Sequence, residues 1–445
     1  MSRTRSATLL LVSAALMALG LPAEAGHSTD PSTNNLHPLG HIEEPASLLN
    51  PAVGNPDVHT DIAFWGNLAF QGNWDGFNIR DISDPGAPTQ VSRTFCNGDQ
   101  GDIVVWGDVL VRSWNTNTGA AGSTCDDQPV APGFEGLHVF DISDLSDPEL
   151  VASVDLPQGS HTATGVPDLE NDRLLIYNSA SSGLNPGIDI VEIPLSAPQD
   201  AAFLRFEPAG RSCHDTGVIL GDAMLAACAG GDGWTLWDIS ANLEDPVQLH
   251  SQTVPGVTIG HSAAFSFDGQ TLVFGHEPGG GVDDRCKASD PVSDRSLFFY
   301  DVDDATDDGS PIGTLQGTWV LPRTQSDAEN CTLHNYNVVP LPSGRDVLVH
   351  GSYQSGTSVV DFTDRANATE LAWSDPPPIP VTFNTPFCQP PGCELGGAWS
   401  SYWYDSFIYE TNITEGLNVF RFSGKETAGA RRLGHLNPQT QEFTI

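Results

Sequence analysis

The sequence predicts an all-β fold, a seven-bladed β-propeller of four-stranded antiparallel blades. Glycine and proline are frequent, with 45 and 33 among 445 residues, a composition typical of short strands joined by many turns. A second observation is a repeated segment in which a glycine or serine precedes alternating apolar residues, an acid in six of the copies, and a final apolar residue. A repeat of this length predicts an array of like units. The seven copies are 46 to 63 residues apart and start at Gly76, Gly136, Gly187, Gly233, Ser296, Gly356 and Gly416.

Each copy lies within the same run of four predicted strands. Before the first copy, residues 62–65 and 68–71 have the pattern of two strands joined by a tight turn. After the copies, an Asp-Pro turn such as Asp147-Pro148 leads into a fourth strand. Strand, turn, strand, loop, strand, turn and strand is the pattern of a propeller blade, so we expect residues 59–424 to form one propeller domain.

The two ends of the chain offer two ways to close the ring. Within an N-terminal arm at residues 26–58, the stretch 36–44 is similar to the fourth strand of a blade, and the last blade lacks an obvious fourth strand of its own. Pairing of this stretch with the last blade would close the ring. A rival closure uses residues 432–436 of the C-terminal tail, which spans residues 425–445. The sequence slightly favours closure by residues 36–44.

The first 25 residues have the pattern of a secretory signal peptide. Arg3 and Arg5 precede an apolar run at residues 7–21, and the small-x-small sequence at residues 23–25 fits a cleavage site. The run is shorter than the ~20 residues that a membrane-spanning helix needs. We therefore expect the mature protein to be secreted or held at the cell surface, without a membrane span.

The chain contains an even number of cysteines, eight, and no C-x-x-C pair. In an exported protein this pattern favours disulfides over thiolate metal sites. The local pairings that we expect are Cys96 with Cys125, Cys213 with Cys228, Cys286 with Cys331, and Cys388 with Cys393.

The charge balance excludes one class of partner. The chain has 18 Lys and Arg against 57 Asp and Glu, a formal net charge of −39, so a phosphate backbone would be repelled. We expect no nucleic acid among the partners, and a monomer whose ligand is an extracellular protein or a small molecule.

The repeat itself resembles the LVIVD repeat of bacterial and archaeal exported or cell-surface propellers. The core of that repeat is Gly-x-x-Ile/Val-x-Asp-Ile/Val-Ser-Asp-Pro-x-x-Pro, and residues 76–88 and 136–148 fit it best. The resemblance covers residues 36–424 and implies the propeller architecture. It implies no activity, because the family has no general biochemical role.

Five histidines recur at one place in the predicted blades, six residues before the first hairpin turn. Gln100 and Ala398 hold this place in the other two blades. The position is the entry to the innermost strand, so these side chains would surround one mouth of the central channel. Neutral imidazole is the commonest ligand of transition metals, and the ring therefore predicts a site for one Cu, Fe or Zn ion. The histidines are His59, His161, His214, His261 and His334.

Other residues near this mouth are candidates for supporting the ligands or for acid and base roles. They stand just after the histidines or at the ends of second strands, and they are Asp61, Asp215, His276, Glu277, His350 and Glu410. The arrangement resembles, in geometry only, the carotenoid oxygenases, which hold iron by four histidines in a propeller. Recurrence is equally compatible with a structural role, in which the histidines bond neighbouring blades and plug the channel.

Two functions follow from these alternatives. The first is an extracellular or cell-surface binding or interaction module. The second is a metal-dependent enzyme, an oxidoreductase or hydrolase, with the histidine ring at its centre. The two differ in whether a cavity with apolar walls lies above the metal. The sequence leaves open whether the protein is an enzyme.

Overall fold

A computed structural model describes most of the chain. The described residues are 30–43, 58–96, 98, 100–115, 123–181, 186–281, 284–285, 287–303, 310–323, 325–326, 329–377 and 396–445. The expected signal peptide lies outside them. Within them the fold is all-β, and no helix is long and apolar enough to cross a membrane.

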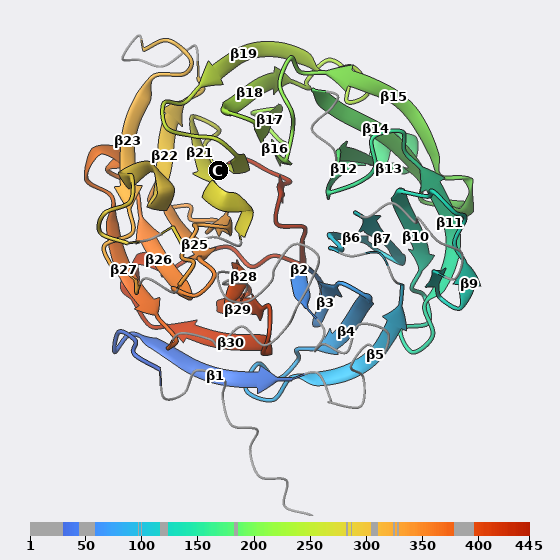
Figure 1. Ribbon diagram of the computed structural model, residues 1–445, viewed down its shortest axis with the longest axis horizontal. Coiled ribbons are helices and arrows are strands. Elements are labelled where there is room, and N and C mark those ends of the chain that lie inside the picture. Colours follow the sequence, from blue (N-terminus) through green and yellow to red (C-terminus); the bar gives the residue numbers. More distant parts are fainter. Residues whose placement is uncertain are drawn as a thin grey trace, which may run out of the picture.

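Antiparallel meanders of four consecutive strands build the molecule, and Figure 1 shows them standing around a ring. We call the strand nearest the centre the inner strand. The inner strands are β2 (His59–Trp65), β6 (Ile103–Trp106), β12 (Thr162–Asp168), β16 (Asp215–Ile219), β20 (Gly260–Phe265), β24 (Asn335–Val338) and β28 (Ala398–Tyr404). The second strands are β3 (Leu68–Asn73), β7 (Val109–Trp114), β13 (Arg173–Ser179), β17 (Leu225–Gly230), β21 (Thr271–His276), β25 (Val347–Gly351) and β29 (Phe407–Asn412).

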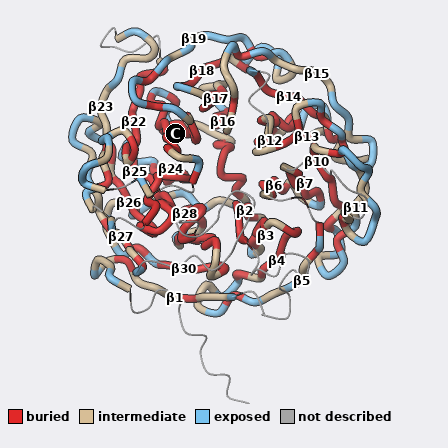
Figure 2. The backbone as a smooth tube through the Cα atoms, viewed as in Figure 1, coloured by how far each residue is buried: buried red, intermediate tan, exposed pale blue. Residues whose placement is uncertain are grey.

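The repeated segment of the sequence is the third strand of each meander. These strands are β4 (Gly76–Asp81), β10 (Gly136–Asp141), β14 (Gly187–Pro194), β18 (Gly233–Asp238), β22 (Ser296–Asp301), β26 (Thr357–Asp361) and β30 (Gly416–Phe422). The outer strands are β5 (Thr89–Phe95), β11 (Glu149–Asp155), β15 (Ala202–Pro208), β19 (Val247–Thr253), β23 (Leu315–Val320), β27 (Thr369–Ser374) and β1 (Leu36–Ile42). Figure 2 shows that exposure is concentrated at the outer strands and that the inner strands are buried.

Short elements complete the fold. The two-residue strands are β8 (Thr124–Cys125), β9 (Gln128–Pro129), β31 (His435–Leu436) and β32 (Thr440–Gln441). Short 3₁₀ helices lie at Leu169–Asn171, Pro198–Asp200, Pro278–Gly281, Val292–Arg295, Arg365–Asn367 and Lys425–Thr427.

The recurring acid at the end of the third strand shapes the turn that follows it. The Asp81 carboxylate accepts a hydrogen bond from the Ser83 backbone N–H at 2.8 Å, and Asp238 accepts one from Ser240 at 2.8 Å. Such bonds favour a turn over continued strand. Apolar side chains of neighbouring meanders pack face to face, as where the Phe77 and Phe140 rings meet edge to face at 5.0 Å. The core therefore lies between the meanders, and the acids serve the fold.

Both ends of the chain take part in the ring. β1 pairs antiparallel with β30, from Leu36 opposite Phe422 to Ile42 opposite Leu417, and so supplies the outer strand of the last meander. The C-terminal residues, expected as a simple tail, instead run through the centre of the ring, where Figure 1 shows the red trace crossing the channel. We call residues 435–445 the channel segment.

The channel segment is bonded to several inner strands. β31 pairs with β2, and β32 pairs in parallel with β16. The Asn437 side chain accepts from Val105 N–H at 2.9 Å and donates to Val105 C=O at 2.8 Å. Gln441 makes the same pair of bonds with Phe265, both at 2.8 Å. Each amide side chain thus replaces the peptide group that a further strand would offer to the free edge of an inner strand.

Candidate metal centre

Four of the five predicted histidines lie side by side at one place in the structure. His161, His214, His261 and His334 stand at or just before the starts of β12, β16, β20 and β24. Neighbouring ring centroids are 4.3, 4.2 and 4.1 Å apart in that order. The Nε2 atoms of His161 and His214 are 2.8 Å apart. We call these four residues the histidine cluster.

His59 does not belong to the cluster. It is buried, but it does not line the cavity onto which the four other histidines open. β2 and β20 share the same irregularity of register, so Ile62 corresponds to Ala263, and Thr60, not His59, stands at the position of His261. Thr60 lines the cavity instead. The expectation of five histidines around the channel mouth is therefore corrected to four.

A carboxylate and a phenol complete the cluster. Glu277, which directly follows β21, has carboxylate oxygens 3.7 Å from Nε2 of His261 and 3.7 Å from Nε2 of His334. Tyr353 donates a hydrogen bond to Glu277 at 2.8 Å. One ligand atom each from His214, His261 and Glu277 lie within 4.8 Å of one another. This distance is compatible with a single ion bound by all three.

In two histidines the hydrogen bond at Nδ1 makes Nε2 the ring nitrogen without a proton, the form that can bind a metal. The Nδ1 of His334 lies 2.6 Å from the Trp399 carbonyl oxygen, and a carbonyl can only accept, so Nδ1 carries the proton. The Nδ1 of His161 lies 2.8 Å from Asn115 Oδ1, which has the same effect when that atom is the amide oxygen. The Nδ1 atom of His261 is buried without a hydrogen-bond partner. Buried ring nitrogens without partners are uncommon and are compatible with metal ligation.

Burial keeps the cluster uncharged at neutral pH. Desolvation lowers the pKa of His161 to about 4 and that of His334 to about 3. It lowers the pKa of His214 and of His261 well below the usual value, and neighbouring histidines add to the effect. Burial raises the pKa of Glu277 to about 7, although the bond from Tyr353 opposes this. Neutral imidazoles are the form that binds metals.

The histidine cluster opens onto a cavity of about 580 Å³. Its walls include the aromatic rings of Trp74, Tyr353 and Trp399 and the side chain of Ile259. Asp61, Asp102 and Asn335 also line it. The cavity combines apolar walls with a few convergent polar groups, as small-molecule sites usually do.

Of the other candidate residues, only Glu277 joins the histidine cluster. Asp61 lines the same cavity and accepts hydrogen bonds from Ser400 at 2.6 Å and Tyr402 at 2.7 Å. Asp215 is buried beside His214 and does not line the cavity; burial and the Asp61 charge raise its pKa to about 8.

The three remaining candidates make structural contacts elsewhere. The Nε2 of His276 accepts a hydrogen bond from Thr258 N–H at 3.2 Å. His350 lies 2.8 Å from the Ser352 hydroxyl, and Glu410 accepts from Asn418 at 2.9 Å. None of the three lines the cavity.

The sequence reasoning missed several cavity residues. Asp102 could have been found, because Asp61, Asp102 and Asp215 recur at the same place in three meanders. In the structure each of the three accepts a hydrogen bond from the backbone N–H of the next residue. Each of these aspartates stands four residues before the end of its inner strand, and alignment on them places Thr60, Gly101 and His214 at one position. Tyr353 had no such signal, because it reaches Glu277 from a loop after β25.

Disulfides brace the loops around the cavity. Cys96 pairs with Cys125 and Cys213 with Cys228, as predicted. Cys331 is also disulfide-bonded, whereas Cys286, Cys388 and Cys393 lie outside the described residues. Cys213 directly precedes His214 and lines the cavity, so this bridge holds the start of β16.

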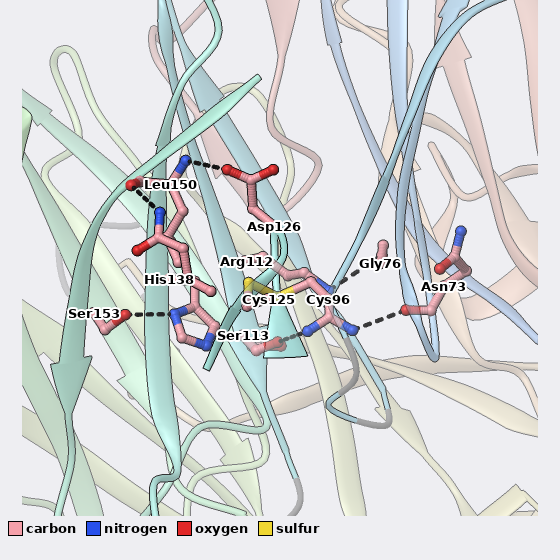
Figure 3. Close-up of a disulfide and its surroundings, with 11 residues drawn as sticks. Asn73, Gly76, Cys96, Arg112, Ser113, Cys125, Asp126, His138, Leu150 and Ser153 are labelled. Atoms are coloured by element: carbon pink, nitrogen blue, oxygen red, sulfur yellow. Dashed lines mark hydrogen bonds between the residues drawn. A yellow bond between two sulfur atoms is a disulfide. The ribbon is translucent and has the colours of Figure 1, made fainter. Parts of the chain in front are cut away.

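The first disulfide lies in a buried polar surround, drawn in Figure 3. The Arg112 guanidinium donates to the carbonyl oxygens of Asn73 at 2.9 Å and Gly76 at 3.1 Å. His138 lies close to both sulfurs, but a disulfide offers no thiolate to a metal. This group is therefore structural.

A comparison of the chain with known protein families finds the same repeat that is visible in the sequence. The model of the LVIVD repeat family matches residues 59–94 and 130–156. Two segments of the chain therefore match the LVIVD repeat. The matches cover the meander β2–β5 and the strands β10 and β11 of the next, where the sequence fits the repeat best. No curated protein matches the chain. The LVIVD repeats support the architecture and leave the ligand to be argued from the cavity.

Proposed function

We propose that the meanders form a seven-bladed β-propeller that is exported from the cell and binds a ligand at one mouth of its channel. The four-stranded meanders around a ring and the two LVIVD matches support the propeller. The disulfides support an oxidising compartment, and the leader-like residues 1–25 support export. The protein then acts as a secreted or cell-surface binding module.

In this proposal the ligand is bound through one transition metal ion held by the histidine cluster. The observation that carries it is the convergence of four uncharged imidazoles and Glu277 on one cavity. His214, His261 and Glu277 are the central ligands. In the proposal His161 and His334, whose rings adjoin His214 and His261, complete the set. Imidazole with one carboxylate suits Zn, Cu or Fe. Two nitrogens bound to one ion at a right angle, as in square-planar Cu(II), lie about 2.9 Å apart, close to the 2.8 Å between His161 and His214. A tetrahedral Zn ion would hold them about 3.3 Å apart.

A metal-dependent oxidoreductase or hydrolase is the second candidate. The cavity favours it, because about 580 Å³ with aromatic walls leaves room for a substrate beside the ion. The ion would supply Lewis-acid or redox chemistry. The Glu277 carboxyl, with a pKa raised by burial to about 7 and a bond from Tyr353, can hold or release a proton near neutral pH.

Metal-dependent stabilisation tests the proposal. Protein freed of metal by a chelator is melted with Zn²⁺, Cu²⁺ or Fe²⁺, because an ion that binds only the folded state raises Tm. We expect a rise for the wild type and for His59→Ala, and none for His261→Ala. His59 is the matched control, since it is equally buried but does not line the cavity. No rise in the wild type, or an equal loss in both variants, would contradict a metal centre.

A further inference from the structure

The cavity has a second polar region beside the histidine cluster. It is formed by residues that come one or two positions later in the inner strands than the histidines do. Asp61 and Asp102 are buried there and line the cavity together with Asn335. The Thr60 hydroxyl donates to the Gly101 carbonyl oxygen at 2.7 Å and so ties the two aspartate-bearing segments together. On the channel side, the Asp61 carboxylate contacts Gln439 of the channel segment. We call Asp61, Asp102, Asn335 and Gln439 the oxygen cluster.

No Lys or Arg side chain lines this cavity among the residues that the structure describes. Asp61 and Asp102 interact with each other and with Asp215, and this repulsion adds to burial in raising the pKa of Asp102 well above its usual value. Tyr402, which donates to Asp61, is affected by the Asp102 charge as well. The Asp102 carboxylate accepts backbone hydrogen bonds from Ile103 at 2.9 Å and Ala163 at 2.7 Å, but its charge remains costly to bury unless a cation or a proton neutralises it.

Two buried amide oxygens point to a cation over a proton. Asn335 and Gln439 each donate through the amide nitrogen to the Oδ2 of Asp61, at 3.2 and 2.9 Å. The amide oxygens, Oδ1 of Asn335 and Oε1 of Gln439, are buried without any hydrogen-bond partner. The two side chains are only 7% and 8% exposed. Buried acceptors that lack a donor are compatible with a positively charged ligand between them.

The available ligand atoms are all oxygens. Ca²⁺ takes six to eight carboxylate, amide and water oxygens in an irregular arrangement, whereas Mg²⁺ requires a near-ideal octahedron and transition metals prefer nitrogen. Two carboxylates and two amide oxygens completed by water fit Ca²⁺ best.

We propose that the oxygen cluster binds a calcium ion between the histidine cluster and the channel segment. The ion neutralises Asp61 and Asp102 and occupies the orphaned oxygens of Asn335 and Gln439. Since Gln439 belongs to the channel segment, calcium also fastens that segment to the inner strands. The site goes beyond the transition-metal site and does not depend on it, although the two share a cavity.

Calcium titration of the mature protein tests this site. The protein is dialysed against EGTA, titrated with CaCl₂ by calorimetry in 150 mM NaCl, and melted with CaCl₂, MgCl₂ or additional NaCl. Salt suppresses weak calcium binding by the acidic surface. We expect one tight calcium ion per chain and a Tm that rises with calcium more than with magnesium.

A matched pair of variants places the ion. Asp102→Asn keeps the size of the side chain and is expected to weaken calcium binding at least tenfold. Asp189→Asn makes the same change at a buried carboxylate of β14 outside the cavity and is expected to leave binding unchanged. No tight calcium ion and no Tm rise in the wild type would overturn the proposal, as would equal weakening in both variants. Elemental analysis of the same samples for Zn, Cu and Fe reports on the histidine cluster separately, so either site can fail alone.

Discussion

The channel segment is expected to contribute strongly to stability, and Asn437 is the residue that tests this most simply. Asn437→Ala removes both hydrogen bonds to Val105, at 2.9 and 2.8 Å, and leaves a buried N–H and a buried C=O without partners. Val105 is fully buried, so water does not replace the lost bonds. Each unsatisfied group costs about 1–3 kcal/mol, and we expect a total loss of about 2–6 kcal/mol in the free energy of unfolding.

Urea unfolding at pH 7.5 measures this loss from the shift in midpoint at constant slope. Asn367→Ala is the control, because Asn367 is an exposed asparagine whose side chain bonds only to Asp364. Exposed substitutions change stability by about 0.5 kcal/mol or less. If Asn437→Ala lowers stability no more than Asn367→Ala does, the channel segment does not hold the inner strands, and the reasoning is wrong.

Two further predictions concern pH and the second disulfide. Burial lowers the pKa of His138 to about 3 in the folded protein. Between about pH 6.5 and 3 the unfolded state therefore binds more protons than the folded state, and the free energy of unfolding decreases as the pH is lowered through this range. His138→Gln removes this contribution, and urea unfolding should show the wild type losing about 2.7 kcal/mol relative to the variant between pH 7.5 and 4.5; parallel pH curves would contradict this. Joint replacement of Cys213 and Cys228 by alanine opens a 15-residue loop and should cost about 3 kcal/mol, whereas an unchanged unfolding midpoint would refute that.

Local repetition is what made the strands predictable from the sequence. Each repeat copy has alternating apolar residues followed by an acid that bonds the next turn, and both signals lie within a few residues of each other. The third strands Gly76–Asp81 and Gly136–Asp141 accordingly begin and end within the repeated segments. The two matched disulfides were predictable for the same reason, because their cysteines are close in the sequence.

The position of His59 shows where counting fails. β2 and β20 have the same irregularity of register, so His59 corresponds to Gly260 and stands one residue before the position of His261. The aspartates that bond the following N–H, Asp61 and Asp215 among them, are the better reference for alignment. They place Thr60 with His214.

The channel segment and the Glu277–Tyr353 pair depend on contacts between distant parts of the chain. Asn437 meets Val105 across 332 residues, and no local pattern encodes that meeting. The alternation of Asn437, Gln439 and Gln441 is a weak signal in retrospect, because alternate residues of an extended segment share a face. Tyr353 and Glu277 are 76 residues apart, and only the ring brings them together.

The metal content of the purified protein tests the central claim most directly. Wild type, His59→Ala and the double variant His214→Ala/His261→Ala are purified from the native host without chelators and analysed for Zn, Cu and Fe per chain. We predict a stoichiometric transition metal in the wild type and in His59→Ala, and its loss from a double variant that is still folded. A wild-type protein without metal, or a double variant that keeps it, would contradict the histidine cluster as a metal centre.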